Sequence, residues 1–501
     1  MKSKSNFWDF LWYNENMNRE QRKRRQKILT IIAETGMVFA VIAIVVVMTL
    51  VAMGYKFGAE GEIEQSGLMQ LHTMPTGATV EIDGKTLFAR SNLSESLSPG
   101  DHYIKITKEG YDSWEKTVTM APGSLMRLYS PRLFLLERET EKVAGLGDLM
   151  FYSASENRNY ILYAKSDSVK WTLMNVKNDN VEMTEIDVAK VFDFIKDNKF
   201  TGKIEHMKWD SDEDKVLIKA SHDGSTEWAL VDLKDVTESV NLTKEFGLDF
   251  SKIEIANSSA GQLMTLENGK LRKVDVDNKS ISRVLVERVE SFTNHGTDVV
   301  YATSRDDNGK RNIGIYKDGA KNSVVVRVVD TDDKVLVGSS AYYDDEYLIY
   351  TVGDRLSVYS GEYPVYTAEM KKSGSNKVLL DSEDSTLKMV LEYTFGFVPE
   401  SLTVSRGGEY VLVKQGREIV SADLDTNKIA GYESKSDKIK WIDDSMLYDV
   451  LDGKVVVWDF DGTNEREIVN GGVSDRAVMI SGDNKYLYYV SDENLMREVI
   501  R

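Results

Sequence analysis

Acidic clusters are the first residues in this 501-residue chain whose types and spacing suggest chemistry. Calcium takes several oxygen ligands, and aspartates at alternate positions can supply them from one loop. However, no cluster has the glycine and glutamate spacing of a helix-loop-helix calcium site. All of these clusters stand between runs that are typical of strands, and Asp, Asn and Gly favour turns at such positions. We therefore interpret the clusters as solvated turns, and we predict no metal and no cofactor. The clusters are Asp210–Asp214, Asp330–Asp333, Asp423–Asn427 and Asp459–Glu465.

Histidines and nucleophile motifs give no catalytic signal either. The five histidines form no H-x-x-x-H or H-E-x-x-H pair, and the sequence has no G-x-S-x-G and no G-x-x-x-x-G-K-[ST] motif. The chain has no cysteine, which excludes thiolate nucleophiles and Cys-ligated zinc. We therefore predict no catalytic residue, and interpret His206 as a half-exposed, hydrogen-bonded strand residue rather than a channel group. The histidines are His72, His102, His206, His222 and His295.

A membrane anchor is predicted near the N-terminus. Residues Thr35–Tyr55 run for 21 positions without a charge, enough for a helix to cross a hydrocarbon core of about 30 Å. Basic residues precede this segment and acidic residues follow it, which places the N-terminus in the cytoplasm and the rest outside the membrane. The alternative is a cleaved signal peptide, whose apolar run is normally about 7–15 residues. The basic topology determinants are Arg22, Lys23, Arg24, Arg25 and Lys27.

Charge and aromatic content distinguish the two sides of this anchor. Residues 1–56 carry a formal charge of +5, whereas the remainder carries −23, which disfavours binding to nucleic acid. The leader contains the aromatic run Phe7–Tyr13. We interpret this run as an interfacial anchor on the inner leaflet, and the alternative is a docking peptide for a cytoplasmic partner.

A small antiparallel β-sandwich is predicted after the anchor. Pro75, Thr76 and Gly77 indicate a turn that enters the strand Val80–Ile82, and the pair Asp83-Gly84 is typical of a hairpin. Further turn signals separate alternating apolar and polar runs through residue 131. No helix pattern follows the glycines, so they do not form a phosphate-binding loop. The positions expected to shape this module are Pro75, Gly77, Ala78, Asp83, Gly84, Gly100, Gly110 and Tyr111.

The order of these signals resembles a PEGA domain over residues 67–131. The patterns P-x-G-A-x-V-x-I-D-G, L-x-P-G-x-H-x-I-x-I and K-x-G-Y-x-x-W occur in sequence. The signature itself reads Pro75-Thr76-Gly77-Ala78, so its glutamate is replaced, and the usual Gly-x-Thr-Pro turn is missing. The resemblance implies a small extracytoplasmic β-module without catalytic residues.

Eight repeated units follow, each with polar turn residues and two apolar strands. Their spacing of roughly 36 to 63 residues is close to that of a four-stranded propeller blade. We predict a seven- or eight-bladed β-propeller, which resembles WD40-like and TolB-like repeats, with Leu133–Glu137 as the strand that closes the ring. A pair of stacked β-sandwiches is the structural alternative. The units begin at Tyr152, Lys208, Glu254, Ser291, Ser339, Leu402, Lys440 and Val478.

The sequence thus predicts a mainly β protein with one transmembrane helix, a PEGA-like sandwich and a propeller. The expected parts are a cytoplasmic leader (1–33), a membrane helix (34–55) that contacts the lipid bilayer, a linker (56–66), the sandwich (67–131) and the propeller (132–501). A rigid array of blades suits recognition, so we expect a non-catalytic cell-membrane protein that binds a protein or an envelope glycan outside the cell. The alternatives are a cell-surface hydrolase with carboxylates at the propeller channel, and a transmembrane sensor.

Overall fold

The structure, a computed structural model, describes residues 19–52, 54–57, 63–129, 131–343, 345–380 and 382–501. The described chain folds as two compact units. The first holds the residues up to Ile106 together with Thr117–Tyr129. The second holds Thr107–Lys116 and the described residues from 131 to Arg501. The aromatic run predicted as an interfacial anchor, Phe7–Tyr13, lies outside the described residues.

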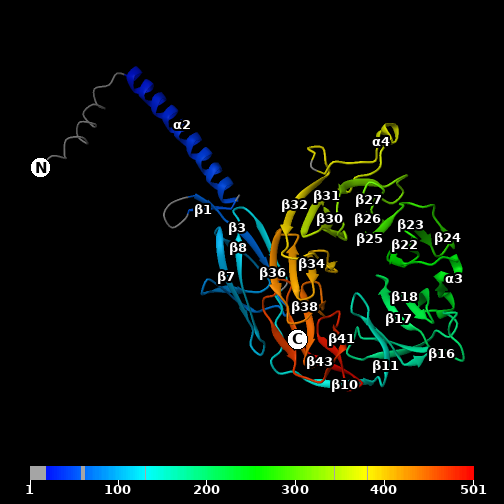
Figure 1. The fold of residues 1–501 in the computed structure, drawn as a ribbon. Coiled ribbons are helices and arrows are strands. Elements are labelled where there is room, and N and C mark those ends of the chain that lie inside the picture. Colours follow the sequence, from blue (N-terminus) through cyan, green and yellow to red (C-terminus); the bar gives the residue numbers. More distant parts are fainter. Residues whose placement is uncertain (1–18, 53, 58–62, 130, 344, 381) are drawn as a thin grey trace. The chain divides into compact units, whose positions relative to one another are not determined.

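A single long helix, α2 (Arg19–Ala52), precedes the sheets (Figure 1). Its segment Lys23–Val51 is long and apolar enough to cross a membrane: it contains an 18-residue window with a mean hydropathy of 2.6, none of which is buried by protein. The helix also includes the basic positions Arg22 to Lys27, which the sequence had assigned to a separate leader. The helix ends at Ala52, and Tyr55, predicted as its last residue, instead begins the strand β1 (Tyr55–Phe57). This strand pairs antiparallel with β2 (Ile63–Gln65), which lies in the span predicted as a linker.

Two sheets form the module that follows. The pairing of β3 with β9 is parallel, so the sandwich is not wholly antiparallel as predicted. Alternating residues of the strands fill its core, among them Val80, Ile82 and Ile104, because successive side chains of a strand point to opposite faces. The three-stranded sheet has the order β6 (Leu93–Leu97), β3 (Gly67–Leu71), β9 (Leu125–Leu128); the four-stranded sheet has the order β5 (Lys85–Arg90), β4 (Thr79–Ile82), β7 (Gly100–Thr107), β8 (Ser113–Met120).

The turn positions singled out in the sequence lie in or next to bends and turns of this module. Pro75 and Gly77 form the bend that leads into β4, and Ala78 is fully buried. Asp83 and Gly84 join β4 to β5 with φ angles of 52° and 77°, as a two-residue hairpin turn of the primed type requires. Gly100 opens β7, and Gly110 has a φ of 80° in the turn before β8. Tyr111, in the second unit, forms a β-bridge with Leu135.

Asp83 also makes contacts that the sequence did not indicate. Its Oδ2 lies 2.6 Å from Nδ1 of the buried His102, and its Oδ1 accepts a hydrogen bond from the Tyr103 amide. The hydrogen bond from His102 holds the pKa of Asp83 below its usual value, with help from the Tyr103 amide. The Asp83 carboxylate therefore has a structural role: it ties β7 to the hairpin between β4 and β5.

Eight four-stranded antiparallel sheets make up the described part of the second unit. Each unit predicted from the sequence begins at a residue in the first strand of one of these sheets. The first four sheets are β11 (Leu149–Ala154), β12 (Tyr160–Lys165), β14 (Lys170–Asn175), β15 (Glu182–Asp187); β17 (Lys203–Trp209), β18 (Lys215–His222), β19 (Ser225–Asp232), β20 (Val240–Asn241); β21 (Lys252–Ile255), β22 (Gln262–Glu267), β23 (Lys270–Asp275), β24 (Ser280–Ile281); and β25 (Val289–His295), β26 (Asp298–Thr303), β27 (Arg311–Tyr316), β28 (Val324–Val329).

The remaining four sheets repeat the same order of strands. They are β29 (Leu336–Tyr342), β30 (Asp345–Val352), β31 (Arg355–Gly361), β32 (Leu387–Thr394); β33 (Ser401–Val404), β34 (Tyr410–Gln415), β35 (Glu418–Asp423), β36 (Lys428–Glu433); β37 (Lys440–Trp441), β38 (Met446–Leu451), β39 (Lys454–Asp459), β40 (Arg466–Val469); and β41 (Val473–Ile480), β42 (Tyr486–Ser491), β43 (Asn494–Val499), β10 (Thr140–Gly145). The connections between these strands contain further short elements: β13 (Asp167–Ser168), which pairs with β16 (Lys199–Phe200), the 3-10 helix η1 (Val236–Glu238), α3 (Leu242–Phe246) and α4 (Ala368–Ser373).

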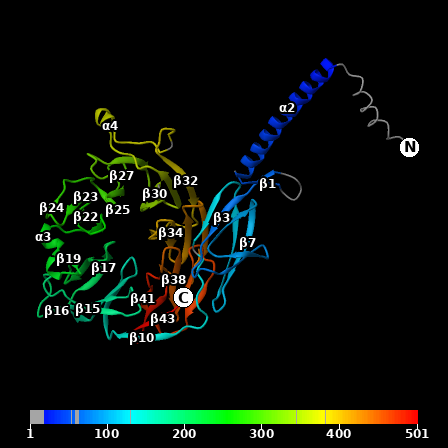
Figure 2. The same cartoon turned by 180° about the vertical axis from the view of Figure 1, so that it is seen from behind.

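The sheets follow one another around a common centre, which is the arrangement of a β-propeller (Figures 1 and 2). First strands of neighbouring sheets contact each other, for example β25 with β29 and β29 with β33. Neighbouring sheets share apolar clusters between their faces, and the first and last sheets share one that includes Leu149, Ile161 and Tyr488. The hydrophobic core of this unit is thus divided into layers between blades.

The strand that completes the last sheet is β10, and the prediction that Leu133–Glu137 would supply it is wrong. Residues Thr140–Gly145 pair with β43 at the C-terminal end of the chain. An outermost strand has one face in water, which suits the polar sequence TEKVAG. Leu133 and Phe134 are instead almost fully buried, because so apolar a run gains more from the core than from a sheet edge.

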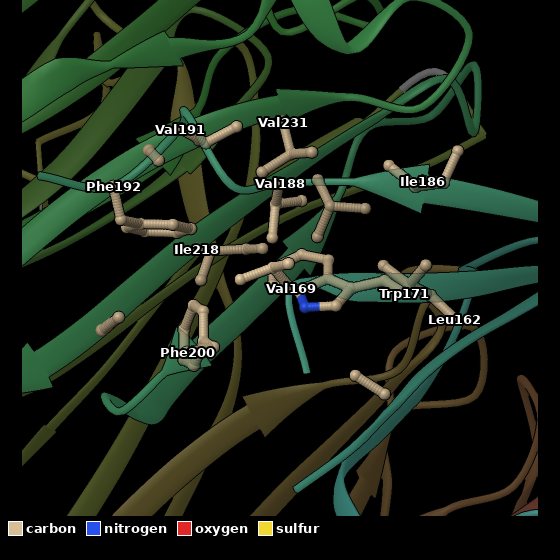
Figure 3. Close-up of a cluster of buried hydrophobic side chains, with 14 of the residues drawn as sticks. Leu162, Val169, Trp171, Ile186, Val188, Val191, Phe192, Phe200, Ile218 and Val231 are labelled. Carbon is tan, nitrogen blue, oxygen red and sulfur yellow. The ribbon is translucent and has the colours of Figure 1, made fainter. Parts of the chain in front are cut away.

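The cluster between the first two sheets is the most aromatic part of the core (Figure 3). Trp171 on β14 points into it and is fully buried. The side chain is in edge contact with Phe151 and Phe200, at ring distances of 4.9 and 5.8 Å. Residues 188–200, which connect the two sheets, add Val191 and Phe192 to the cluster. The segment that connects the two blades therefore also contributes residues to the core between them.

Candidate binding sites on the propeller

The acidic clusters lie in turns as predicted, but two of their aspartates, Asp210 and Asp459, are buried. Asp210 is 1% exposed, and its Oδ1 accepts hydrogen bonds from the amides of Asp214 and Lys215. Burial raises the pKa of Asp210, and the two amide hydrogen bonds oppose that shift. Asp423 closes its own turn by accepting from the amides of Asp425 and Thr426. Within the described residues, no group of three or more His, Cys, Asp or Glu is arranged to hold a metal ion.

Of the residues in the acidic clusters, Asp459 fits the interpretation as a solvated turn least well. It ends β39, is fully buried, and accepts hydrogen bonds from Trp114 Nε1 at 2.8 Å and Asn464 Nδ2 at 3.0 Å. Lys116 Nζ and Arg466 Nη2 each lie 3.9 Å from its carboxylate. Trp114 and Lys116 belong to the segment Thr107–Lys116 of the second unit. The tryptophan of the K-x-G-Y-x-x-W pattern therefore has a buried carboxylate as its partner.

The histidines are dispersed over the described part of the chain. His206 is an exposed residue of β17, and its ring lies 5.9 Å from that of Trp228. His222 stacks on Phe194 at 5.2 Å, and His72 stacks on Tyr129 at 4.4 Å. These are packing contacts of strand and loop residues, with no second imidazole beside them.

Turns between first and second strands meet on one face of the propeller and are linked by Arg406. Its Nη1 donates to the backbone oxygen of Glu156 and to Asn157 Oδ1, and its Nε donates to Asp444 Oδ1 at 3.2 Å. Asn157 in turn donates from its backbone to Glu213 Oε1 at 3.1 Å. Turns of four different sheets are thereby joined by hydrogen bonds, which makes this face a rigid surface.

Glu409 lies in one of these turns and has a strongly perturbed acidity. Burial raises its pKa to about 7, and the neighbouring Asp423 adds to the shift. Hydrogen bonds from Tyr410 and Tyr342 oppose it. Asp423, on β35 of the same sheet, is another carboxylate whose pKa is raised by burial. Burial also raises the pKa of Asp298 in the sheet β25–β28, where it accepts a hydrogen bond from the Asp318 amide.

Stability should fall as the pH rises through the range in which Glu409 titrates. Because the folded-state pKa lies above the ordinary value near 4.5, the folded protein retains a proton that the unfolded chain releases. The stabilisation is present below about pH 4.5 and is lost by about pH 7, an effect of up to about 3 kcal/mol. Urea midpoints of Glu409→Gln should be less pH-dependent than those of the wild type between pH 5 and 8. The exposed Glu418→Gln is the control, and an unchanged slope in Glu409→Gln would contradict the assignment.

A pocket of about 370 Å³ opens at the outer rim of the propeller, and sequence reasoning did not find it. We call it the rim pocket. One wall is the connection that enters β25, including Val286 and Arg288; another is the sheet β25–β28. The third is residues 362–386 between β31 and β32, which we call the α4 excursion. The residues come from three distant segments without a common motif, so no local signal in the sequence could have revealed the pocket.

The α4 excursion is held in place by its base and by the edge of β28. Tyr363 is 1% exposed, and its hydroxyl lies 2.9 Å from Ser339 Oγ and 2.6 Å from the Tyr347 carbonyl. The Val325 amide donates to the Asn376 carbonyl, and the Val378 amide donates to the Val325 carbonyl. The α4 helix has a Thr367 N-cap and a left-handed Gly374 C-cap. The wall is therefore held by hydrogen bonds within the chain itself.

Comparison with known proteins identifies the module that precedes the propeller. Residues 66–131 match the PEGA domain family, as the spacing of the turns had predicted. None of the curated proteins compared matches the chain. The PEGA match covers a small part of the chain and names no ligand.

The solved structures to which the chain is similar include two described as β-propellers. The β-propeller domain of Cps50 (Swd1) from Myceliophteria thermophila is 9% identical, with a TM-score of 0.39; the match covers 73% of this chain and 100% of that one. The Dos1 propeller is 12% identical, with a TM-score of 0.42 and coverage of 72% and 94%. An oligogalacturonate lyase in complex with manganese is 14% identical, with a TM-score of 0.36 and coverage of 58% and 88%.

The chain is thus a mainly β protein of a recognisable class. It combines an apolar N-terminal helix that is long enough to anchor a membrane, a PEGA domain and a β-propeller. This combination suggests a binding or scaffold role.

Proposed function

We propose that this protein is a membrane-anchored binding protein whose propeller recognises a protein or glycan of the cell envelope. The observation that supports binding most directly is the rim pocket, a preformed cavity on a rigid rim. Its walls are fixed by main-chain hydrogen bonds, and a site that needs no ordering on binding loses less free energy to conformational entropy. The proposal includes no catalysis, and the alternatives are a hydrolase and a transmembrane sensor.

We also propose that α2 remains uncleaved, with its N-terminus in the cytoplasm and its PEGA domain and propeller outside. Lys23, Arg24 and Lys27 at the first part of the helix, followed by a long acidic remainder, support this orientation. Because the chain has no cysteine, single substitutions give a clean test. A membrane-impermeant maleimide should label intact cells that carry Asn308→Cys and leave Ser5→Cys unlabelled until the cells are opened. The reverse pattern would contradict the orientation, and loss of residue 5 from the mature chain would indicate a signal peptide.

The binding function is tested with the solubilised full-length chain and isolated envelope fractions. Wild-type protein should retain an envelope polysaccharide or protein through several washes without changing its mass. Mass spectrometry of the bound and released material distinguishes the proposal from hydrolysis, because an enzyme would release shorter products. Retention of no envelope component would contradict the binding function. Deletion of residues 1–20 tests the sensor alternative, since only a sensor requires the leader for its cellular response.

A further inference from the structure

The rim pocket has polar walls whose internal hydrogen bonds are already arranged. The Tyr301 hydroxyl, on a side chain 2% exposed, lies 2.9 Å from Ser323 Oγ. Asn376 Nδ2 from the α4 excursion donates to the Ser323 carbonyl at 3.1 Å. A glycine at position 314 makes room for this arrangement, because a Cβ there would lie 2.3 Å from the Tyr301 hydroxyl oxygen. The floor of the pocket is therefore fixed by packing and by hydrogen bonds between two separate segments.

Other polar groups in the pocket have hydrogen-bonding capacity that the protein does not use. The side chains of Asn312 and Asn322 and the hydroxyl of Tyr366 line the cavity, and none forms a hydrogen bond with any residue that the structure describes. Each amide side chain has both donors and an acceptor, and a phenolic hydroxyl can do either. The pocket thus presents mixed donors and acceptors beside the aromatic ring of Tyr366.

We propose that the rim pocket binds a neutral carbohydrate, as a sugar unit of an envelope glycan. This inference rests on the binding function proposed above and names its ligand class. Adjacent hydroxyls on a sugar ring can donate to an amide oxygen and accept from an amide nitrogen at the same time, which matches Asn312 and Asn322. A cavity of about 370 Å³ is within the range of about 300–1,000 Å³ usual for small-ligand pockets. Tyr366 offers a ring on which the apolar face of a sugar can pack.

Charge and polarity disfavour other ligand classes. Arg288 is the cation of the pocket, but Glu287 lies next to it, and residues 57–501 carry a formal charge of −23, which repels anions. An apolar ligand would bury the amides of Asn312 and Asn322 without partners, which costs free energy for each unpaired group. A neutral ligand rich in hydroxyls satisfies these groups without introducing charge.

The test is binding of the full-length chain, in nanodiscs free of sugar-based detergent, to arrays of neutral hexose and N-acetylhexosamine oligosaccharides. Wild-type protein should bind at least one immobilised oligosaccharide, with little change between about 0.1 and about 0.5 M salt because no ion pair contributes. Free monosaccharides added as competitors distinguish a single sugar from an extended glycan. Asn312→Leu/Asn322→Leu and Tyr366→Ala should each weaken binding roughly tenfold or more. The matched control is Asn308→Leu, at an exposed position in the turn between β26 and β27.

Two results would overturn the carbohydrate assignment. One is that wild-type protein binds none of the neutral oligosaccharides; the other is that binding persists unchanged in both pocket variants, whose urea midpoints show that they are folded. If the chain still retains an envelope protein in either case, the proposed binding function stands and only the ligand class fails. If it retains no envelope component at all, both proposals fail together.

Discussion

Replacement of Trp171 by alanine is expected to lower the free energy of unfolding of the propeller by about 3–5 kcal/mol. The side chain is fully buried between the first two sheets, beside Phe192 and Phe200 (Figure 3). Phe151 also contacts its ring, at a ring distance of 4.9 Å. Removing the indole deletes its transfer free energy and leaves a cavity that a rigid β layer cannot fill by relaxation. Aromatic edge contacts of this kind add about 0.5–1.5 kcal/mol beyond buried area.

Urea denaturation of the solubilised full-length chain, followed by fluorescence, measures this effect. Trp171→Phe should lose less stability, because it retains an aromatic ring for Phe151 and Phe200 to contact. Thr184→Ala, at an exposed position of the adjacent strand β15, should change the free energy of unfolding by about 0.5 kcal/mol or less. A loss below about 1 kcal/mol in Trp171→Ala would show that the first two sheets do not pack as described.

A loss of similar size, about 3–5 kcal/mol, is expected for Asp459→Ala. The variant removes the acceptor for Trp114 Nε1 and the negative charge near Lys116 and Arg466, whose side chains are only 14% and 12% exposed. Buried donors and cations that lose their partner incur the full cost of desolvation, which exceeds the net value of the interaction itself. Lys116 retains a second partner, Asp461, at 2.7 Å, which limits the loss.

Asp459→Asn distinguishes the hydrogen bond from the charge. It preserves an acceptor for the Trp114 indole, and burial already raises the pKa of Asp459 against the opposing effect of Lys116 and Arg466. We therefore expect Asp459→Asn to be clearly more stable than Asp459→Ala in the same urea titration. Asp461→Asn, at the half-buried partner of Lys116, is the comparison for loss of charge alone. Equal midpoints for wild type and Asp459→Ala would contradict a structural role for the buried carboxylate.

Local patterns in the sequence determined the order of the elements. The uncharged run Thr35–Tyr55 predicted a helix because length and hydropathy alone decide whether a segment can cross a bilayer. Asp83-Gly84 predicted a tight hairpin because positive φ angles favour these residues, and the observed angles agree. The repeats predicted a propeller because each blade has the same alternation of strands and turns. In each case the physical cause operates within a few residues of the chain.

Tertiary structure decided which residues meet. Asp459 has the sequence context of a solvated turn, yet it is buried because Trp114, 345 positions earlier, donates to it. The outermost strand of the last sheet is the polar segment Thr140–Gly145, because charged side chains at a sheet edge remain in solvent. The apolar Leu133 and Phe134 are buried in the core instead. The rim pocket likewise brings Asn312 together with Tyr366 through an excursion between two strands of another sheet. Burial and ligand contacts are long-range properties, and they exist only once the sheets have packed.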